Sequence, residues 1–185
     1  MRGPVLCLCL LLGGCAMEEM AAGSETPVGN GVYVTPQPGF AEIHLATIRY
    51  WTRNGTGLDE LGFYTGIKGG EPLFPVPGTA KKDLPVFRPQ MTPNDVAELA
   101  AAALSAKYQQ PARASNLHPC PFAAATGFCF DLSFANEEGL EMRGRAITRL
   151  QNGVLDLLIF TAPAEYYFAE VDPSIDRIYA SIWSK

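Results

Sequence analysis

Apolar and polar residues alternate in the segment GFCFDLSFA at residues 127–135. Alternation with this period is typical of a β-strand that buries one face. Further along, the Asn152-Gly153 dipeptide is the strongest short hairpin signal, and a two-residue turn there pairs Gln151 with Val154. The pattern therefore predicts antiparallel strands in the last third of the chain.

The turn before that hairpin sets the register of a third strand. A three-residue loop ending at a left-handed Gly139 pairs Asn136 with Leu140. A shift of the strand pairing by one residue would move the apolar side chains of a strand to the other face of the sheet. Both turns instead give a register that keeps the apolar side chains on one face, which supports a three-stranded meander. The register sets two acidic residues opposite two arginines: Asp131 faces Arg145, and Asp156 faces Arg149.

The meander then has one apolar and one polar face. The polar face holds a candidate binding patch of Arg143, Arg145 and Arg149, since guanidinium groups suit carboxylates or phosphates. The alternative, which the pattern favours, is that Asp131 and Asp156 already pair two of these arginines on a solvated face. The apolar face comprises Phe128, Phe130, Leu132, Phe134, Met142, Ala146, Leu150, Leu155, Leu157 and Ile159.

The segment TPNDVAELAAAALSAKY predicts a helix with Thr92 as N-cap and Pro93 at its first position. Its alanines favour close packing against a sheet. Because Leu158 and Phe160 lie on the polar face of the meander, we expect this helix to cover part of that face. Its apolar stripe has helical period and comprises Val96, Leu99, Ala100, Ala103 and Leu104.

A last helix is predicted to begin at Pro173, with Asp172 as its cap. We expect it to pack on the apolar face of the meander. Its buried stripe comprises Ile175, Ile178, Tyr179 and Ile182.

The first half of the chain gives weaker signals. Residues 40–51 have strand composition, and residues 61–74 suggest a short hairpin that turns at residues 68–70. Residues 72–93 carry six prolines and predict an extended connector without regular pairing. The predicted fold class is α+β: an antiparallel sheet with a C-terminal three-stranded meander and helices packed on it.

This order of elements, with the segment FTAPAEYYF before the terminal helix, resembles the PsbP-like α/β/α sandwich family. The resemblance rests on element order and the apolar pattern of the carboxyl-terminal part. It implies an α/β/α sandwich and a non-catalytic assembly or binding role.

The amino terminus has the pattern of an export signal. The apolar run from Val5 to Leu12 is far shorter than the roughly 20 residues that span a bilayer. It follows Arg2 and precedes Gly13 and Gly14, in the order of a charged region, an apolar region and a small-residue cleavage site.

The next residue is a cysteine, and the motif Leu12-Gly13-Gly14-Cys15 resembles the lipobox of bacterial lipoproteins. The resemblance implies cleavage before Cys15 and lipidation of its sulfur. Because Ala16 is not aspartate, it implies the outer membrane with the protein facing the periplasm. The alternatives are an ordinary cleaved signal and a buried strand.

We expect the chain to have three parts: a signal peptide at residues 1–14, a lipidated cysteine with a flexible tether at residues 15–31, and one α+β domain at residues 32–185.

The net charge limits the classes of molecule that the chain is expected to bind, and the cysteine count indicates which cysteines can pair. The formal net charge is −5, which disfavours nucleic acid and electrostatic binding to anionic lipid, so the acyl chains on Cys15 are the expected membrane link. Of the five cysteines, Cys7 and Cys9 leave with the signal, and Cys120 and Cys129 are expected to form a disulfide in an oxidising compartment. The alternative, zinc bound by these two with His118, has unfavourable spacing.

No known catalytic motif is present in the sequence: it has no phosphate loop, no GxSxG and no HExxH. Only two histidines occur, His44 and His118. We therefore expect no catalytic residue, no metal and no cofactor. The leading hypothesis is a lipid-anchored envelope protein that contacts another envelope component. The alternatives are a carrier of an apolar or amphipathic small ligand and, with no supporting motif, an envelope hydrolase.

Overall fold

The computed structural model describes residues 18–45 and 48–185. Its strands are β1 (Glu18–Glu19), β2 (Thr26–Gly29), β3 (Val32–Val34), β4 (Ala41–Leu45), β5 (Ile48–Thr52), β6 (Glu60–Ile67), β7 (Arg113–Phe122), β8 (Ala125–Ala135), β9 (Glu141–Gln151), β10 (Val154–Pro163) and β11 (Trp183–Ser184). Its helices are α1 (Pro93–Tyr108), α2 (Tyr167–Ala180) and the 3-10 turn η1 (Lys81–Asp83).

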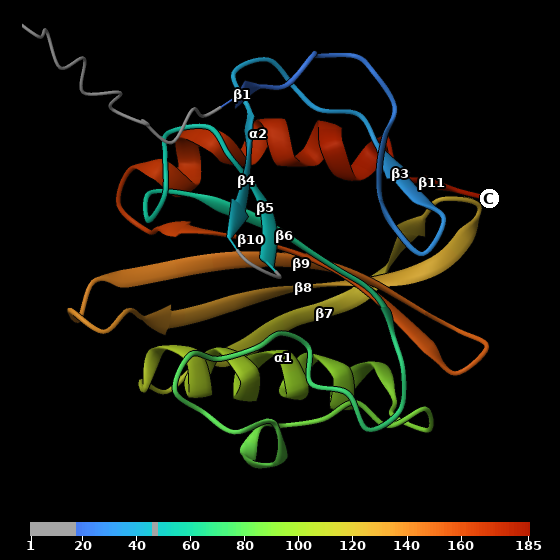
Figure 1. The fold of residues 1–185 in the computed structure, drawn as a ribbon, viewed down its shortest axis with the longest axis vertical. Coiled ribbons are helices and arrows are strands. Elements are labelled where there is room, and N and C mark those ends of the chain that lie inside the picture. The colour runs from blue at the N-terminus through green and yellow to red at the C-terminus, as the bar shows by residue number, and fades with distance from the viewer. Residues whose placement is uncertain (1–17, 46–47) are drawn as a thin grey trace, which may run out of the picture.

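The described strands form two antiparallel sheets, of which the main one lies between the two helices and the small one packs beside α2. The main sheet has eight strands in the order β1-β4-β5-β6-β10-β9-β8-β7, and the small sheet has the order β11-β3-β2. Helix α1 covers one face of the main sheet, and α2 covers the other (Figure 1). The predicted α+β class is confirmed, and the arrangement is an α/β/α sandwich.

The predicted register of the meander is confirmed. The Asn136 N–H donates to the Leu140 carbonyl oxygen at 2.9 Å, and Gln151 pairs with Val154. The two charged pairs also face each other as predicted: Asp131 with Arg145, and Asp156 with Arg149.

The meander is part of a wider sheet than expected. Strand β6 pairs with β10 on one side, and β7 pairs with β8 on the other. Strand β7 was not predicted, because Pro119 and Pro121 argue against a strand. The sheet tolerates both prolines because β7 lies at its edge, where many backbone N–H groups have no ladder partner.

Both predictions of how the helices pack were wrong, because the helices cover the opposite faces. Helix α1 packs on the apolar face, among residues such as Leu132 and Leu157. Helix α2 packs on the other face, where Ile175 lies in one cluster with Leu158 and Phe160. Strand alternation defines two faces, but it does not determine which helix reaches which face.

Helix α2 begins at Tyr167, earlier than the predicted start at Pro173. A proline inside a helix removes one backbone hydrogen bond. The helical turns before Pro173 are nevertheless stabilised by packing, since Val171 is fully buried and Phe168 stacks on Phe160 with ring centroids 5.5 Å apart. Tertiary packing therefore extends the helix through the proline.

The expected tether over residues 15–31 is wrong for its described part. Residues 18–31 contain β1, which pairs with β4, and β2, which pairs with β3 and contributes the buried Val28. The predicted signal peptide 1–14 and the lipidation site Cys15 lie outside the described residues. In the described ranges, neither helix combines the length and apolarity needed to cross a membrane.

The middle of the chain is extended, as predicted, but the expected hairpin at residues 68–70 does not form. Strand β6 ends at Ile67, and the proline-rich connector contributes an isolated bridge between Pro72 and Val86. Within the segment predicted to have strand composition, Ala41–Leu45 and Ile48–Thr52 form the paired strands β4 and β5.

Candidate functional site

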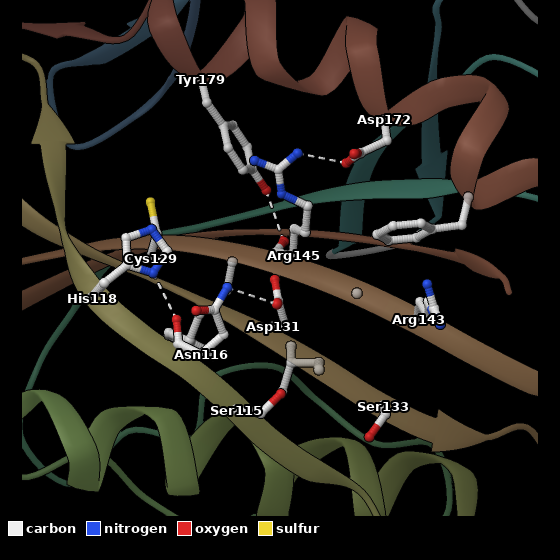
Figure 2. A pocket seen from close by; sticks show the side chains of 15 residues that line it. Ser115, Asn116, His118, Cys129, Asp131, Ser133, Arg143, Arg145, Asp172 and Tyr179 are labelled. Atoms are coloured by element: carbon white, nitrogen blue, oxygen red, sulfur yellow. Dashed lines mark hydrogen bonds and ion pairs between the residues drawn. The ribbon is translucent and has the colours of Figure 1, made fainter.

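On the α2 side, part of the main sheet carries polar side chains beyond the reach of the helix. Helix α2 packs on β9 and β10, and the sheet continues past it into β8 and β7. A hollow of about 590 Å³ lies above these strands (Figure 2). We call this area the shelf and define it by six of its residues: Asn116, His118, Asp131, Ser133, Arg143 and Arg145.

Arg149, one member of the predicted patch, lies inside the protein. Its side chain is 8% exposed and donates to the Asp156 carboxylate at 2.7 Å. That carboxylate also accepts from the Asn30 side-chain amide at 2.8 Å and from the Gly66 N–H at 2.9 Å. Arg149 therefore stabilises the β9–β10 hairpin and is not part of the shelf.

Arg145 holds helix α2 against β9. Its guanidinium lies 2.6 Å from Asp172 Oδ1 and 2.7 Å from Asp176 Oδ1. Burial lowers the pKa of Arg145, but hydrogen bonds and charge from the two carboxylates outweigh it and raise that pKa above its usual value. The Tyr179 hydroxyl donates to the Arg145 carbonyl oxygen at 2.9 Å, and burial raises the pKa of this tyrosine. These contacts fix the rim of the shelf.

Asp131 and Arg143 have no ion-pair partner in the described part of the chain. Asp131 lies opposite Arg145, but its carboxylate accepts from the Asn116 side-chain amide at 3.0 Å. The Arg143 side chain is exposed and borders the hollow. Of the three predicted arginines, Arg143 is therefore the one whose guanidinium is available to a ligand.

The pairing of β7, β8 and β9 adds Arg113, which was not among the predicted arginines. Arg113 of β7 faces Ser133 of β8, which in turn faces Arg143 of β9. Residues directly opposite in an antiparallel sheet share a face, so these three exposed residues form one row. The pairing of β7 with β8 would have located Arg113, but the prolines of β7 obscured that strand.

The shelf contains serine, histidine and aspartate without assembling them into a catalytic group. His118 Nδ1 donates to the Asn116 carbonyl oxygen at 2.7 Å. Among the hydrogen bonds of the described residues, none joins His118 to a serine or to a carboxylate. An activated nucleophile needs a base within hydrogen-bond reach, and the described hydrogen bonds of His118 supply none to a serine of the shelf.

The expected disulfide joins Cys120 and Cys129, whose Cα atoms are 5.8 Å apart. It links β7 to β8 beside the shelf, and Cys129 borders the hollow. Because both sulfurs are bonded to each other, they are not available as the zinc ligands considered above. The disulfide instead fixes the position of the edge strand.

A small apolar recess lies on the opposite face, where α1 begins. Its lining includes Pro93, Val96, Phe128 and Leu150, and its volume is about 240 Å³. Pockets for drug-sized ligands usually measure about 300–1,000 Å³. The recess therefore suits a short acyl or aromatic group better than a whole lipid.

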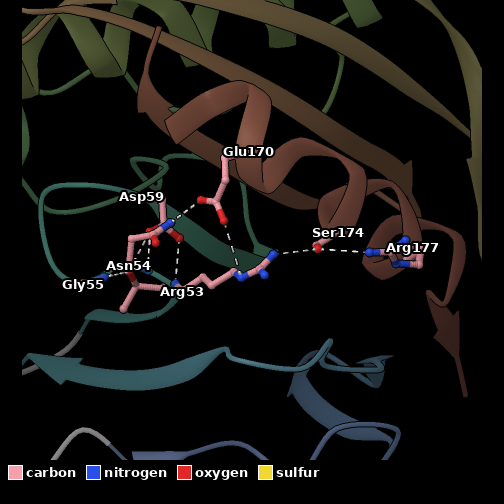
Figure 3. A network of polar contacts seen from close by, with 8 residues as sticks. Arg53, Asn54, Gly55, Asp59, Glu170, Ser174 and Arg177 are labelled. Atoms are coloured by element: carbon pink, nitrogen blue, oxygen red, sulfur yellow. Dashed lines mark hydrogen bonds and ion pairs between the residues drawn. The ribbon is translucent and has the colours of Figure 1, made fainter. Parts of the chain in front are cut away.

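A second polar network fastens the loop between β5 and β6 to helix α2 (Figure 3). The Asp59 carboxylate is 1% exposed and accepts from the backbone N–H groups of Arg53 and Asn54, both at 2.7 Å. Asn54 also donates to Glu170 of α2 at 2.7 Å. Burial raises the pKa of Asp59, although its hydrogen bonds oppose the shift. The network pairs the polar atoms of the loop with those of α2.

Comparison with known proteins supports the fold. No protein-family model and no curated protein matches the chain. Among solved structures, the chain is similar to the solution structure of cyanobacterial PsbP (CyanoP) from Synechocystis sp. PCC 6803, with 13% identity and a TM-score of 0.58. The similarity covers 97% of this chain and 99% of that one, so it extends well beyond the carboxyl-terminal part. The chain has a PsbP-like fold.

Proposed function

We propose that this chain is a lipid-anchored, non-catalytic protein of the bacterial cell envelope that docks another envelope protein through the shelf. The observation that carries the docking role is the polar surface of β7, β8 and β9 beside α2, where Asp131 and Arg143 have no ion partner. The disulfide and Arg145 hold this surface in place. A preorganised surface loses little conformational entropy on binding.

The proposed anchor is Cys15, and the sequence Leu12-Gly13-Gly14 before it supports lipidation. Its acyl chains would hold the protein on the outer membrane, facing the periplasm. Strand β1 begins at Glu18, and each residue spans at most about 3.6 Å, so the folded part would lie within about 11 Å of the anchor. The domain would therefore sit close to the membrane.

Intact mass spectrometry of the chain extracted from envelopes tests the anchor. We expect the mass of a chain that begins at Cys15 and carries a diacylglycerol and an amide-linked acyl group. Replacement Cys15→Ser should release the protein from the membrane fraction or leave its leader uncut. An unmodified thiol at this position in the wild type would refute the anchor.

Substitution on the shelf tests the docking role. Ser133→Trp places a large ring in the hollow, whereas Thr126→Trp places the same ring at an exposed site on the opposite face of β8. Affinity purification of the full chain from cross-linked envelopes should recover one stoichiometric partner. Ser133→Trp should reduce its recovery at least about tenfold, a loss of roughly 1.4 kcal/mol in binding, and Thr126→Trp should not. Equal recovery with both variants would refute docking at the shelf.

The second candidate function is carriage of a small apolar ligand, which the recess beside α1 supports. Fluorescence titration with a short-chain fatty acid tests it, with Val96→Trp as the variant that fills the recess. Saturable binding that Val96→Trp abolishes would favour the carrier. Binding that survives this variant, or no binding, would eliminate it.

A further inference from the structure

Asparagine is followed by glycine at three places in the sequence: Asn30-Gly31, Asn54-Gly55 and Asn152-Gly153. This dipeptide is chemically labile, because glycine has no side chain to shield its backbone nitrogen or to restrict its backbone. After a solvent base removes its proton, that nitrogen attacks the side-chain carbonyl carbon of the asparagine. A C–N bond forms, ammonia leaves, and the product is a cyclic imide. Water then opens the ring at either carbonyl and gives aspartate or isoaspartate.

The net reaction is hydrolysis of a side-chain amide, with water as the only co-reactant and no change of oxidation state. Two structural conditions control its rate in a folded protein. The glycine N–H must be free of hydrogen bonds, and the asparagine side chain must be free to turn its carbonyl carbon toward the glycine nitrogen. Because the three dipeptides are identical, the fold determines which of them reacts first.

Asn54 meets neither condition. The Gly55 N–H donates to the Thr52 hydroxyl at 2.9 Å, and the Asn54 side-chain amide donates to the Glu170 carboxylate at 2.7 Å (Figure 3). A hydrogen bond to a charged acceptor is stronger than one between neutral groups. The fold therefore holds both reacting groups of this dipeptide in place.

Asn30 is held by a similar bond. Its side-chain amide donates at 2.8 Å to the carboxylate of Asp156, a residue that is only 2% exposed. The side chain also packs closely on the backbone of β6, because a Cβ placed on Gly66 would lie 3.3 Å from the Cβ of Asn30. Attack at Asn30 would therefore require the β2–β3 turn to detach from the main sheet.

Asn152 lies at the exposed tip of the β9–β10 hairpin. Both turn residues are left-handed, with φ of 54° at Asn152 and 73° at Gly153. Among the hydrogen bonds of the described residues, none involves the Asn152 side chain or the Gly153 N–H. Attack requires this turn to open, and only the ladder pair of Gln151 with Val154 closes it at the end of the hairpin. Opening at the end of an element costs less free energy than opening in its interior.

We propose that Asn152 is a modification site at which this chain undergoes spontaneous deamidation to aspartate and isoaspartate, and that the hydrogen bonds of Asn30 and Asn54 protect the other two dipeptides. The inference goes beyond the proposed function, since it requires neither the anchor nor a docking partner.

The isoaspartate product changes the hairpin. Its backbone runs through the former side chain and is longer by one methylene, which a two-residue turn cannot accept without losing its geometry and the register that it sets. Leu150 and Leu155 form the second ladder pair from this turn, and both line the apolar recess beside α1. Formation of isoaspartate at Asn152 therefore alters one wall of the recess.

Ageing of the full chain in detergent micelles at mildly alkaline pH tests the proposal. Trypsin cleaves after lysine and arginine, so the three dipeptides fall in separate peptides: one that ends at residue 49, residues 54–68 and residues 150–177. Mass spectrometry follows the conversion of amide to acid in each peptide. Asn152 should convert at least about tenfold faster than Asn30 or Asn54, because hydrogen bonds to charged acceptors keep the reactive conformations of those two rare. In urea all three should convert at comparable rates.

Two pairs of variants give matched controls. Glu170→Ala removes the acceptor of Asn54 and should speed conversion there, whereas Glu165→Ala, altered at an exposed carboxylate that bonds to no asparagine among the described residues, should not. Amide exchange over residues 150–155 should be faster in the isoaspartate form of the protein. Asn152→Asp has the same added charge with a normal backbone, and its exchange should match that of wild type.

Three results would overturn the proposal: conversion at Asn30 or Asn54 ahead of Asn152 in the folded chain, rates at all three sites that equal those in urea, or an intact Asn152 in the folded chain after the urea sample has converted. Equal conversion of Asn54 in Glu170→Ala and Glu165→Ala would refute protection by the hydrogen bond to Glu170.

Discussion

Arg149 and Asp156 face each other across the β9–β10 hairpin with almost no solvent contact. Removal of one member of such a pair leaves a buried charge without compensation. We expect Asp156→Ala to lower the free energy of unfolding by about 3–5 kcal/mol, measured by urea denaturation. The double variant Arg149→Met/Asp156→Leu should recover most of this loss. Equal destabilisation by both variants would show that the cost does not come from the unpaired charge.

Asp59 gives a prediction of pH dependence. Its pKa in the folded protein is raised above the unfolded value of 3.8 by burial. Folding therefore favours the protonated form, and this stabilisation is present below the unfolded pKa and is lost as pH rises through the folded pKa. The stability advantage of wild type over Asp59→Asn should fall with rising pH in that window and then level off. An advantage that grows with pH would contradict the direction of the shift.

At the scale of single residues, the sequence predicts contacts only within one hairpin. The pair Arg149–Asp156 was predictable because a single turn sets its register. The contact of Arg145 with Asp172 was not, because it depends on which helix covers that face. Asp131 illustrates the consequence: its position opposite Arg145 was predicted correctly, yet its carboxylate accepts from Asn116.

At the scale of elements, the disulfide ties the edge strand to the sheet. In the chain-entropy model, a loop as short as that between Cys120 and Cys129 contributes about 2–3 kcal/mol. The variant Cys120→Ser/Cys129→Ser should lose about this much stability, and amide exchange should increase most in β7. Wild type treated with dithiothreitol should behave in the same way. Faster exchange in α1 with β7 unchanged would contradict this role.

Element boundaries were predictable where local chemistry determines them. Thr92 caps α1 as expected, and its hydroxyl accepts from the Asp95 N–H at 3.2 Å. Strand β7 and the first turns of α2 were missed because Pro119, Pro121 and Pro173 are local breakers that tertiary packing tolerates here. Strand β1 was missed because its partner β4 lies elsewhere in the chain. The β2–β3 hairpin has a local signal that was overlooked, since it turns at Asn30-Gly31, the same dipeptide as Asn152-Gly153.

At the scale of the whole molecule, β1, the first described strand after the proposed anchor in the sequence, and β7 lie at opposite ends of the main sheet. Strand β1 is at one edge and β7 at the other. With neighbouring strands about 4.8 Å apart, seven spacings separate them by up to roughly 34 Å. Lipidation at Cys15 would therefore hold the β1 edge near the bilayer and direct β7 toward the aqueous compartment.

Fluorescence quenching tests this orientation. A fluorophore on Ala22→Cys, in the exposed turn after β1, should be quenched by spin-labelled lipid headgroups. The same fluorophore on Leu117→Cys in β7 should be quenched much less, because quenching requires close approach. Equal quenching at both sites would mean that the domain lies flat on the membrane or is not held at its β1 edge.

Photo-crosslinking in intact cells tests the central claim of docking at the shelf most directly. A photoreactive phenylalanine is placed at position 133 on the shelf or at position 126 on the opposite face of β8. The account predicts one discrete adduct from position 133, identified by mass spectrometry as a single envelope protein, and no such adduct from position 126. An adduct from position 126 alone, or the same products from both positions, would contradict it.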